Sequence, residues 1–232
     1  MCQSTDPKDQ RLRSCVVVEC DGKYILIDTG PDLRMQMLKG AIPRIDAILY
    51  THEHNDHVIG LDDIRPYNFK QKAELPVYGL PRVLDEVHRR FAYAFDGNGY
   101  PGAPKATLHP ISGDNTLHIC GVDIVPIHVE HGRLPILGYR VGDFGFITDA
   151  NAVTEKETAK LKGVHTLVVN ALHHRQHPAH FNLEEALAFI EKVGPSRAYI
   201  THVSHFMGKY ADWTQRLPAD VFAAYDGLVL DL

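Results

Sequence analysis

The chain has 232 residues, a length that one large α/β domain often reaches without dividing. Hydrophobic residues make up 44% and charged residues 23%, which are ordinary values for a globular protein. The formal net charge of −5 provides no general attraction to phosphate backbones, so long nucleic acid is disfavoured as a partner. There is no apolar run of about 18 residues, no signal-peptide pattern and no disulfide framework, so we expect a cytoplasmic protein without a membrane segment.

Hydrophobic spacing and turn residues predict alternating strands and helices in the first half of the chain. Asp21-Gly22 is typical of a hairpin turn, Gly40 is a helix stop, and Gly and Pro predict a loop over Asp96–Pro104. The expected elements are strands over Ser14–Glu19 and Lys23–Asp28, a helix over Pro31–Lys39, strands over Asp46–Tyr50 and Pro76–Tyr78, and a helix over Val83–Phe95.

The second half is expected to begin with a hairpin within Asn115–Val129, around Cys120-Gly121, and to continue with another around Gly142-Asp143. The further elements are strands over Ile136–Arg140 and Phe144–Thr148, a helix over Thr154–Leu161, a strand over Thr166–Asn170, a helix over Leu183–Val193, a strand over Ala198–Thr201 and a final apolar run over Gly227–Leu232. Strands outnumber helices early and alternate with them later. This order favours two sheets with helices packed outside them.

The segment Thr51–His57 holds three histidines and an aspartate directly after a predicted buried strand. Imidazole suits Zn, Fe or Mn, and a carboxylate suits the harder ions of that set. A single ion cannot comfortably take four ligands at this spacing. The pattern H-x-H-x-D-H therefore predicts two adjacent ions, with His52 and His54 for one and Asp56 and His57 for the other.

A site with two metal ions needs further ligands, and strand ends are suitable places because the backbone is well defined there. His131, Asp149 and His202 each follow a predicted strand, and the carboxylate of Asp149 could bridge two ions. His128 competes with His131 for the same role. We prefer His131 because Gly132 after it gives the backbone room to turn around an ion.

These ligands, in this order, resemble the metal-binding pattern of the metallo-β-lactamase superfamily. The resemblance covers nearly the whole chain, as one domain over residues 1–232. It implies an α/β fold of the four-layer αββα type, with two mixed sheets, outer helices and two divalent metal ions at one rim of the sheets. It also implies that Asp28, in Asp28-Thr29-Gly30, is a buried residue that orients the metal loop.

A closer likeness is to the branch of this superfamily that hydrolyses cyclic phosphates in phosphonate breakdown. It rests on Thr201–His205, on Tyr225–Leu228 and on His180, which lies 22 residues before His202. In that branch a histidine at this place is catalytic and binds no metal, so we expect His180 to be catalytic together with Asp56. Three other histidines of the same segment are equally compatible with plain solvent exposure, and they are His173, His174 and His177.

The branch usually begins with a Gly-rich strand and a Cys-x-Cys-x-x-Cys cluster, which holds a structural zinc together with a late histidine. Only Cys2 and His205 match these positions here. Two ligands cannot complete a tetrahedral zinc site. We therefore expect either that the first strand and two cysteines are missing from this sequence, or that an additional structural zinc site survives only as a remnant.

The resemblance implies a dinuclear hydrolase, most of all a phosphodiesterase that opens small cyclic phosphate esters of the phosphoribosyl type. Two ions, Zn or Mn with Fe as an alternative, would activate a water and clamp the phosphodiester oxygens. His180 would protonate the leaving oxygen as a general acid. Arg65 is a further candidate for a phosphate contact, although a salt bridge with Asp62 is the stronger expectation. The expected partner is thus a small phosphorylated substrate.

Several alternatives stay open. A tRNA 3′-end-processing endonuclease would use a protruding basic arm, and the short segment Lys70–Glu74 and the negative net charge argue against one. A lactonase, a thioester hydrolase or a single-iron sulfur dioxygenase would use the same scaffold, and the intact ligand set argues against a purely binding role. The helix Val83–Phe95 and the loop after it are candidates for a substrate lid or for the contact of a homodimer.

Overall fold

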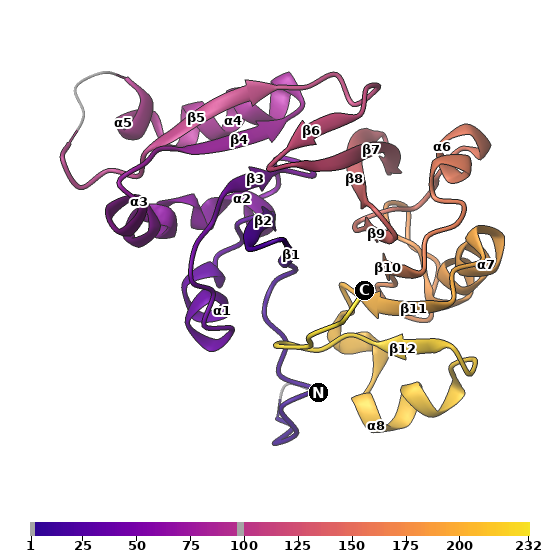
Figure 1. Ribbon diagram of the computed structural model, residues 1–232. Coiled ribbons are helices and arrows are strands. Elements are labelled where there is room, and N and C mark those ends of the chain that lie inside the picture. Colours follow the sequence, from indigo (N-terminus) through magenta and orange to yellow (C-terminus); the bar gives the residue numbers. More distant parts are fainter. Residues whose placement is uncertain (1–2, 97–99) are drawn as a thin grey trace. The chain divides into compact units, whose positions relative to one another are not determined.

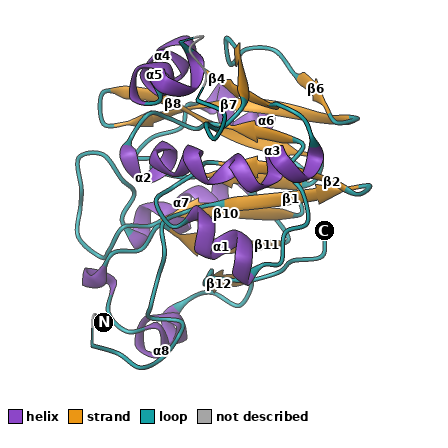
Figure 2. Ribbon diagram, turned by 90° about the vertical axis from the view of Figure 1, so that its left-hand side faces the viewer, coloured by secondary structure: helices purple, strands orange, loops and turns teal. Residues whose placement is uncertain are grey.

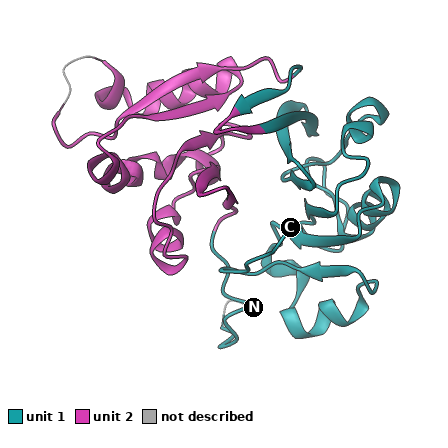
Figure 3. Cartoon of the chain, in the orientation of Figure 1, with its two compact units in different colours: residues 1–12, 114–118, 123–232 teal, residues 13–113, 119–122 magenta. Residues whose placement is uncertain are grey.

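The computed structural model describes residues 3–96 and 100–232. The chain divides into two compact units, which Figure 3 shows in different colours. Unit 1 comprises residues 1–12, 114–118 and 123–232, and unit 2 comprises residues 13–113 and 119–122. The prediction of a single domain over 1–232 that lacks a first strand remains a prediction.

Unit 2 contains a five-stranded mixed sheet, seen in Figure 1. Its strands, in spatial order, are β1 (Val16–Cys20), β2 (Lys23–Ile27), β3 (Ala47–Leu49), β4 (Leu75–Gly79) and β5 (Ala106–Pro110). β1 and β2 are antiparallel, and the remaining neighbours are parallel. The predicted hairpin turn is confirmed, because Asp21 and Gly22 both have positive φ, 49° and 74°.

The helices of unit 2 pack around a core that includes Leu26, Ile48 and Val77 from the sheet and Val83 and Val87 from α4. They are α1 (Leu33–Lys39), α2 (Asn55–Val58), α3 (Arg65–Gln71), α4 (Pro81–Arg90) and α5 (Ala92–Phe95), with a 3-10 segment over Ile59–Ile64. The prediction of one helix over Val83–Phe95 was wrong. Phe91 leaves the helical region, with φ −114° and ψ 35°, and separates α4 from α5.

A seven-stranded mixed sheet lies in unit 1, apart from the tip of its β6–β7 hairpin, residues 119–122, which belongs to unit 2. Its strands, in spatial order, are β12 (Val221–Ala223), β11 (Arg197–Thr201), β10 (Thr166–Asn170), β9 (Phe144–Ile147), β8 (Leu134–Val141), β7 (Val122–His131) and β6 (Leu117–Ile119). β9 to β12 run parallel to one another, whereas β7, β8 and β9 are antiparallel. The carboxyl ends of four strands therefore meet at one sheet edge.

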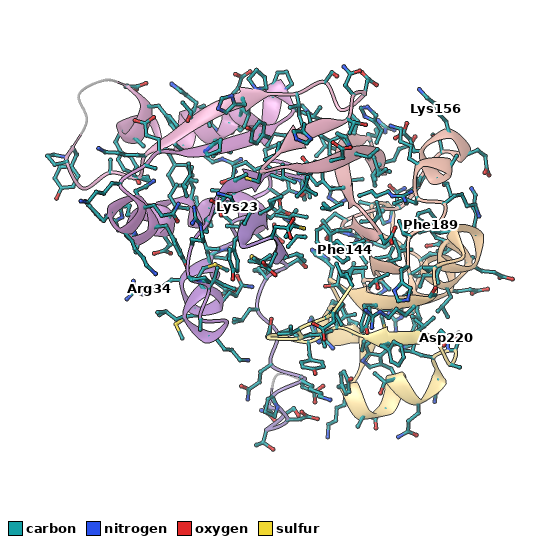
Figure 4. All side chains as sticks on the ribbon, in the orientation of Figure 1. Lys23, Arg34, Phe144, Lys156, Phe189 and Asp220 are labelled. Carbon is teal, nitrogen blue, oxygen red and sulfur yellow. The ribbon has the colours of Figure 1, made fainter. Side chains whose placement is uncertain are left out.

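The helices of unit 1 are α6 (Glu155–Lys160), α7 (Leu183–Val193) and α8 (Tyr210–Trp213), with short 3-10 segments over His205–Met207 and Thr214–Arg216. α7 begins with a reciprocal capping box between Asn182 and Glu185 and ends at Gly194, whose φ is 72°. It contacts β10 and buries Phe189, whereas Lys156 on α6 is exposed; Figure 4 labels both side chains.

The predicted fold class is confirmed, because both sheets are mixed and helices accompany each of them, as Figure 2 shows. The predicted strand Thr166–Asn170 and helix Leu183–Val193 have the observed bounds of β10 and α7. In the part of the chain that the structure describes, none of the helices combines the length and the apolar character needed to span a membrane.

Candidate metal centre

The histidine-rich segment of unit 2 begins where β3 ends and continues into the short helix α2. His52 follows β3 by three residues, His54 is the residue before α2, and Asp56 and His57 lie within that helix. The side chains of His52 and His57 are buried, that of Asp56 is half-buried and that of His54 is exposed. The sequence therefore brings four potential ligands together without any contribution from distant parts of the chain.

The ring nitrogens of this group lie at distances that suit metal binding. His52 Nε2 and His54 Nδ1 are 3.0 Å apart. Two nitrogens bound to one tetrahedral zinc at about 2.0–2.1 Å would be about 3.3 Å apart, so a small adjustment admits an ion. His57 Nε2 lies 3.8 Å from Asp56 Oδ2. These two pairs are the pairs that the spacing predicts.

The buried carboxylate of Asp28 is hydrogen-bonded to two residues of this segment, Thr51 and His57. Asp28 follows β2 with φ 65°, is 1% exposed, and accepts hydrogen bonds from Thr51 N at 2.9 Å and Thr51 Oγ1 at 2.8 Å. His57 Nδ1 donates to Asp28 Oδ2 at 2.7 Å. Burial raises the pKa of Asp28, and its hydrogen bonds with His57 and Thr51 oppose the rise. This is the geometry of the buried orienting residue that the resemblance implies.

Thr51 links Asp28 by hydrogen bonds to a second histidine, His52. The hydroxyl hydrogen of Thr51 is donated to Asp28, so Thr51 Oγ1 accepts from His52 Nδ1, 3.0 Å away. His52 and His57 therefore both carry their proton on Nδ1 and their lone pair on Nε2. That tautomer is the one in which imidazole binds a metal through Nε2.

A close backbone contact fixes α2 against the residues after β2. Thr29 N donates to His57 O at 2.7 Å, and Gly60 N donates to Thr29 O at 2.8 Å. A Cβ atom added to Gly60 would lie 2.0 Å from Gly30 O, and one added to Gly30 would lie 2.5 Å from Asp56 O. Only glycine permits this approach at either position.

Glu53, between the first two histidines, is held by α4. Both of its carboxylate oxygens accept from Arg82 Nη1, and its backbone carbonyl accepts from Arg90 Nη1. Sequence reasoning missed these contacts, because nothing in the spacing pairs Glu53 with a helix about thirty residues later. The candidate phosphate contact Arg65 instead forms the expected salt bridge, with Nη2 2.9 Å from Asp62 Oδ2.

Unit 1 gathers a second group of ligands from separate elements. One ligand atom from each of His131, Asp149 and His180 lies within 4.8 Å of the others. His131 ends β7, Asp149 follows β9 by two residues, and His180 lies in the loop before α7. Two of these positions were predicted as ligands from strand ends, and His180 was predicted as a catalytic residue.

His131 occupies the position that the sequence favoured over His128. His131 is 7% exposed, and its Nδ1 donates to Ala179 O at 2.7 Å, so Nε2 carries the lone pair. His128, three residues earlier, faces the other side of the strand and pairs with Asp114 through Nε2 at 3.2 Å. Gly132 has φ 64°, as the preference for His131 requires.

Hydrogen bonds fix Asp149 and the residue after it. Thr148 Oγ1 donates to Asp149 Oδ2 at 2.7 Å, and the side chain of Asn170 pairs with both backbone groups of Ala150 at 2.7 and 3.0 Å. The other oxygen, Oδ1, lies 3.2 Å from His202 Nε2 and 3.6 Å from His180 Nδ1. A carboxylate between two imidazoles is a suitable ligand arrangement for a divalent ion.

Three of the candidate residues have a left-handed backbone. Asp28, Asp149 and His202 follow β2, β9 and β11 with φ of 65°, 57° and 53°. Residues other than glycine seldom adopt this conformation, which costs about 1–3 kcal/mol and clusters at functional sites. In each case the turn occurs one or two residues after a strand that has a parallel neighbour.

His180 lies among other imidazoles. Its ring centroid is 4.6 Å from that of His131 and 5.2 Å from that of His202, with which it is stacked. Its Nδ1 atom is buried and makes no hydrogen bond to any of the described residues. Burial lowers the pKa of His180 to about 3, Asp149 opposes this, and the neighbouring histidines add to the decrease.

The predicted remnant of a structural zinc site remains untested. Cys2 lies outside the described residues. His205 is exposed, and its ring lies 3.9 Å from that of Phe206. Among the residues that the structure describes, no group of three potential ligands includes His205.

The donor set of each unit fits a divalent metal ion. His52, His57 and His131 are held as Nδ1–H tautomers by protein acceptors. A carboxylate accompanies the histidines in each unit, Asp56 beside His57 in unit 2 and Asp149 beside His131 and His180 in unit 1. Imidazole and carboxylate together suit Zn²⁺, Mn²⁺ or Fe²⁺. A buried nitrogen without a hydrogen bond, His180 Nδ1, adds a further potential donor in unit 1.

Comparison with known proteins identifies relatives over most of the chain. A model of the beta-lactamase superfamily domain matches residues 23–203. The crystal structure of a new diphosphatase from the PhnP family has a TM-score of 0.92 and 35% identity, and the match covers 100% of this chain and 88% of that one. Together with the His and Asp groups, this supports a metal-dependent hydrolase.

Two curated relatives carry different names. An octanoyltransferase of Porphyromonas gingivalis is 38% identical over 230 residues, which are 98% of this chain and 46% of that protein. A ribonuclease Z of Bradyrhizobium diazoefficiens is 36% identical over 106 residues, which are 44% of this chain and 33% of that protein. The chain thus spans less than half the length of the first curated relatives it matches.

Proposed function

The chain belongs to the beta-lactamase superfamily, and we propose that it is a metal-dependent hydrolase of small phosphodiesters, above all of cyclic phosphate esters of the phosphoribosyl type. The observation that carries the phosphate chemistry is the similarity over the full chain to a protein described as a diphosphatase of the PhnP family, and the preference for a cyclic ester rests on the resemblance of His180 and Thr201–His205 described above. Supporting it, the ligand groups of both units are of the kind used in phosphoryl transfer. The net charge of −5 argues against long nucleic acid but does not exclude a small phosphorylated substrate, because bound divalent ions dominate the local field.

The protein side chains would bind and orient. His52, His54, Asp56 and His57 would hold metal in unit 2, with Asp28 and Thr51 maintaining the tautomers of His52 and His57. In unit 1, His131, Asp149 and His202 would be ligands. When bound, divalent ions in such sites activate water as a nucleophile and neutralise charge on phosphoryl oxygens. We keep the sequence prediction of two ions, Zn or Mn with Fe as an alternative.

His180 would act on the leaving group. With a pKa that burial lowers to about 3, its ring is neutral near pH 7. Asp149 lies on the Nδ1 side of the ring, at 3.6 Å, so Nε2 is the atom directed away from the carboxylate. We propose that the ring takes up the proton released by the attacking water, which the nearby carboxylate of Asp149 favours, and donates it from Nε2 to the departing oxygen, so that the ring returns to its neutral form.

A second candidate function is the endonuclease activity suggested by relatives named ribonuclease Z. Several of them match 44–57% of the chain at 30–36% identity. The negative net charge favours the small substrate over tRNA. For the octanoyltransferase, the matched part is less than half of that protein, and we propose no acyl transfer for this chain.

One experiment separates these candidates and tests His180. The purified protein is analysed for metal content and assayed with a cyclic ribose phosphate, a linear phosphodiester, a diphosphate, a precursor tRNA, a lactone and a thioester. The cyclic ester should be the best substrate. His180→Ala should lower its turnover by about 10²–10⁴-fold and leave the metal content unchanged.

The matched control is His165→Ala, since His165 is an exposed histidine of the same unit. It should retain both turnover and metal. Loss of metal in His180→Ala would make His180 a ligand and not a catalytic residue. Two bound metals with no turnover of any phosphodiester would overturn the proposed function.

A further inference from the structure

An arginine lies beside the candidate metal ligands of unit 2. Arg13 is the first residue of that unit and lies three residues before β1. Its Nη1 atom is 3.7 Å from Asp56 Oδ2, and the same oxygen is 3.8 Å from His57 Nε2. The side chain of Arg13 is 60% exposed. A solvent-accessible guanidinium is therefore adjacent to a carboxylate that we expect to bind metal.

The backbone of Arg13 is fixed by the N-terminal part of α1. Arg13 N donates to Asp32 Oδ2 at 2.8 Å, and Arg13 O accepts from Gln36 Nε2 at 2.6 Å. The stem of the side chain thus begins at a defined place, and only its end has to be ordered when a ligand binds. A fixed stem reduces the entropy cost of that ordering.

The guanidinium of Arg13 has donors available for a second anion. At 3.7 Å its contact with Asp56 is an ion pair that is too long for a hydrogen bond. Among the residues that the structure describes, none accepts a hydrogen bond from this guanidinium. An exposed ion pair of this length contributes little to stability, whereas a guanidinium offers five N–H donors. Its contact with Asp56 therefore accounts for only part of what this group can bind.

The other arginines discussed for unit 2 are engaged elsewhere. Arg65, the phosphate contact considered from the sequence, has an acceptor within 3.2 Å of each of its three side-chain nitrogens. Arg82 and Arg90 of α4 both donate to Glu53. Of these four arginines, Arg13 is the one that combines unused donors with a position beside a candidate ligand.

We propose that Arg13 donates to the non-bridging oxygens of the phosphoryl group that reacts, and so is a further catalytic residue. A guanidinium can give two parallel N–H bonds to two oxygens of a phosphate. Negative charge spreads onto these oxygens as the nucleophile bonds to phosphorus, so a cation beside them stabilises the transition state more than the substrate. The inference rests on the proposed function and deepens it, because it assigns a protein group to the reacting phosphate. It requires no particular leaving group.

Calorimetry with inorganic phosphate on the metal-loaded protein tests this contact without turnover. Arg13→Ala should weaken phosphate binding by about tenfold, as expected for the loss of a hydrogen bond to a charged group. Arg13→Lys should weaken it less, because it keeps the charge but loses the planar fork. The matched control is Arg34→Ala, at an exposed arginine of α1 that Figure 4 labels, and it should bind phosphate as the wild type does.

Metal affinity, measured by competition with a chelator, separates a phosphate contact from a residue that only holds Asp56. Arg13→Ala should bind metal at least as tightly as the wild type, because a positive charge beside the site is removed. Weaker metal binding in this variant would overturn the inference, as would equal binding of phosphate by the wild type and Arg13→Ala.

Turnover adds a third measurement. The kcat/KM for a cyclic ribose phosphate should fall by about 10–100-fold in Arg13→Ala, as expected for a charge-assisted hydrogen bond to the reacting group. An unchanged kcat/KM in this variant would overturn the inference. If the wild type hydrolyses no phosphodiester, the proposed function fails, and the binding of inorganic phosphate still decides whether Arg13 contacts a phosphate.

Discussion

In unit 2 the candidate ligands His52, His54, Asp56 and His57 come from six consecutive residues. In unit 1 the candidates come from the ends of three strands, β7, β9 and β11, and from the loop before α7. The first group is held by hydrogen bonds from two neighbouring side chains, those of Asp28 and Thr51. The second depends on the order in which strands lie in a sheet.

The two groups also differ in what orients their histidines. In unit 2 the acceptors are side chains, namely Asp28 and Thr51. In unit 1 the acceptor for His131 is the backbone carbonyl of Ala179, which no substitution removes. A point mutation should therefore loosen the group of unit 2 easily, whereas the group of unit 1 should respond mainly to changes that move a strand.

The largest effect is expected from Gly60→Ala in unit 2. The added Cβ would lie 2.0 Å from Gly30 O, so the backbone between the Asp28 loop and α2 must move. We expect the free energy of unfolding to fall by about 3 kcal/mol, the upper end for overpacking. Urea-induced unfolding measures this loss.

Gly40→Ala is the matched control for Gly60→Ala. At Gly40, which is exposed, the nearest atom to an added Cβ is Gln36 O at 3.2 Å, and the φ of −77° suits alanine. Gly40→Ala should lower the free energy of unfolding far less than Gly60→Ala does. Equal losses in the two variants would mean that the contact between Gly30 and Gly60 does not hold the metal segment.

Asp28→Asn should have the next largest effect, on metal affinity. With its oxygen in the place of Oδ1 the amide still accepts from Thr51 N, but its NH2 group in the place of Oδ2 accepts from neither Thr51 Oγ1 nor His57 Nδ1. Metal affinity should fall by about 10–100-fold, the usual consequence of removing an orienting partner. Competition with a chromogenic chelator provides the measurement.

Asp85→Asn makes the same charge change at an exposed position of unit 2 and should retain the affinity of the wild type. If Asp28→Asn binds metal as tightly as this control does, side-chain orientation is not what distinguishes unit 2 from unit 1.

The sequence predicted the candidate ligands whose positions depend on short-range or regular features. Thr51–His57 is local, so its spacing alone indicates a metal site. Asp149 and His202 could be found because consecutive parallel strands end at one sheet edge, and Gly132 favoured His131 over His128. These inferences require only strand positions and no knowledge of which side chains meet.

The partners of these residues could not be predicted in the same way. Glu53 pairs with Arg82 and Arg90 only because α4 packs against that loop, and Ala179 meets His131 only because a long loop returns to β7. The strands β5 and β12 were missed as well. β5 is largely exposed and β12 has three residues, so neither has a clear hydrophobic pattern.

Glu157 on α6 allows the same comparison to be tested in unit 1. It is hydrogen-bonded to β7, the strand that ends at His131. Its Oε2 accepts from His128 N on β7 at 2.8 Å and from Lys160 Nζ at 2.7 Å. Burial alone would raise the pKa of Glu157, but the hydrogen bonds with Lys160 and His128 and the charge of Lys160 outweigh it. The pKa is therefore below its usual value.

A lowered pKa in the folded state means that the carboxylate stabilises the fold above its unfolded pKa of 4.5, and that this stability is lost as the pH falls through the folded pKa. Glu157→Gln should thus cost about 1 kcal/mol of unfolding free energy near pH 7. Below pH 4.5 the difference from the wild type should shrink toward zero. Urea unfolding across this pH range measures it, with Glu191→Gln, at an exposed position of α7, as the control. A difference that persists unchanged in acid would mean that the charge of Glu157 does not hold β7 in place, and that strand order in unit 1 rests on its apolar core alone.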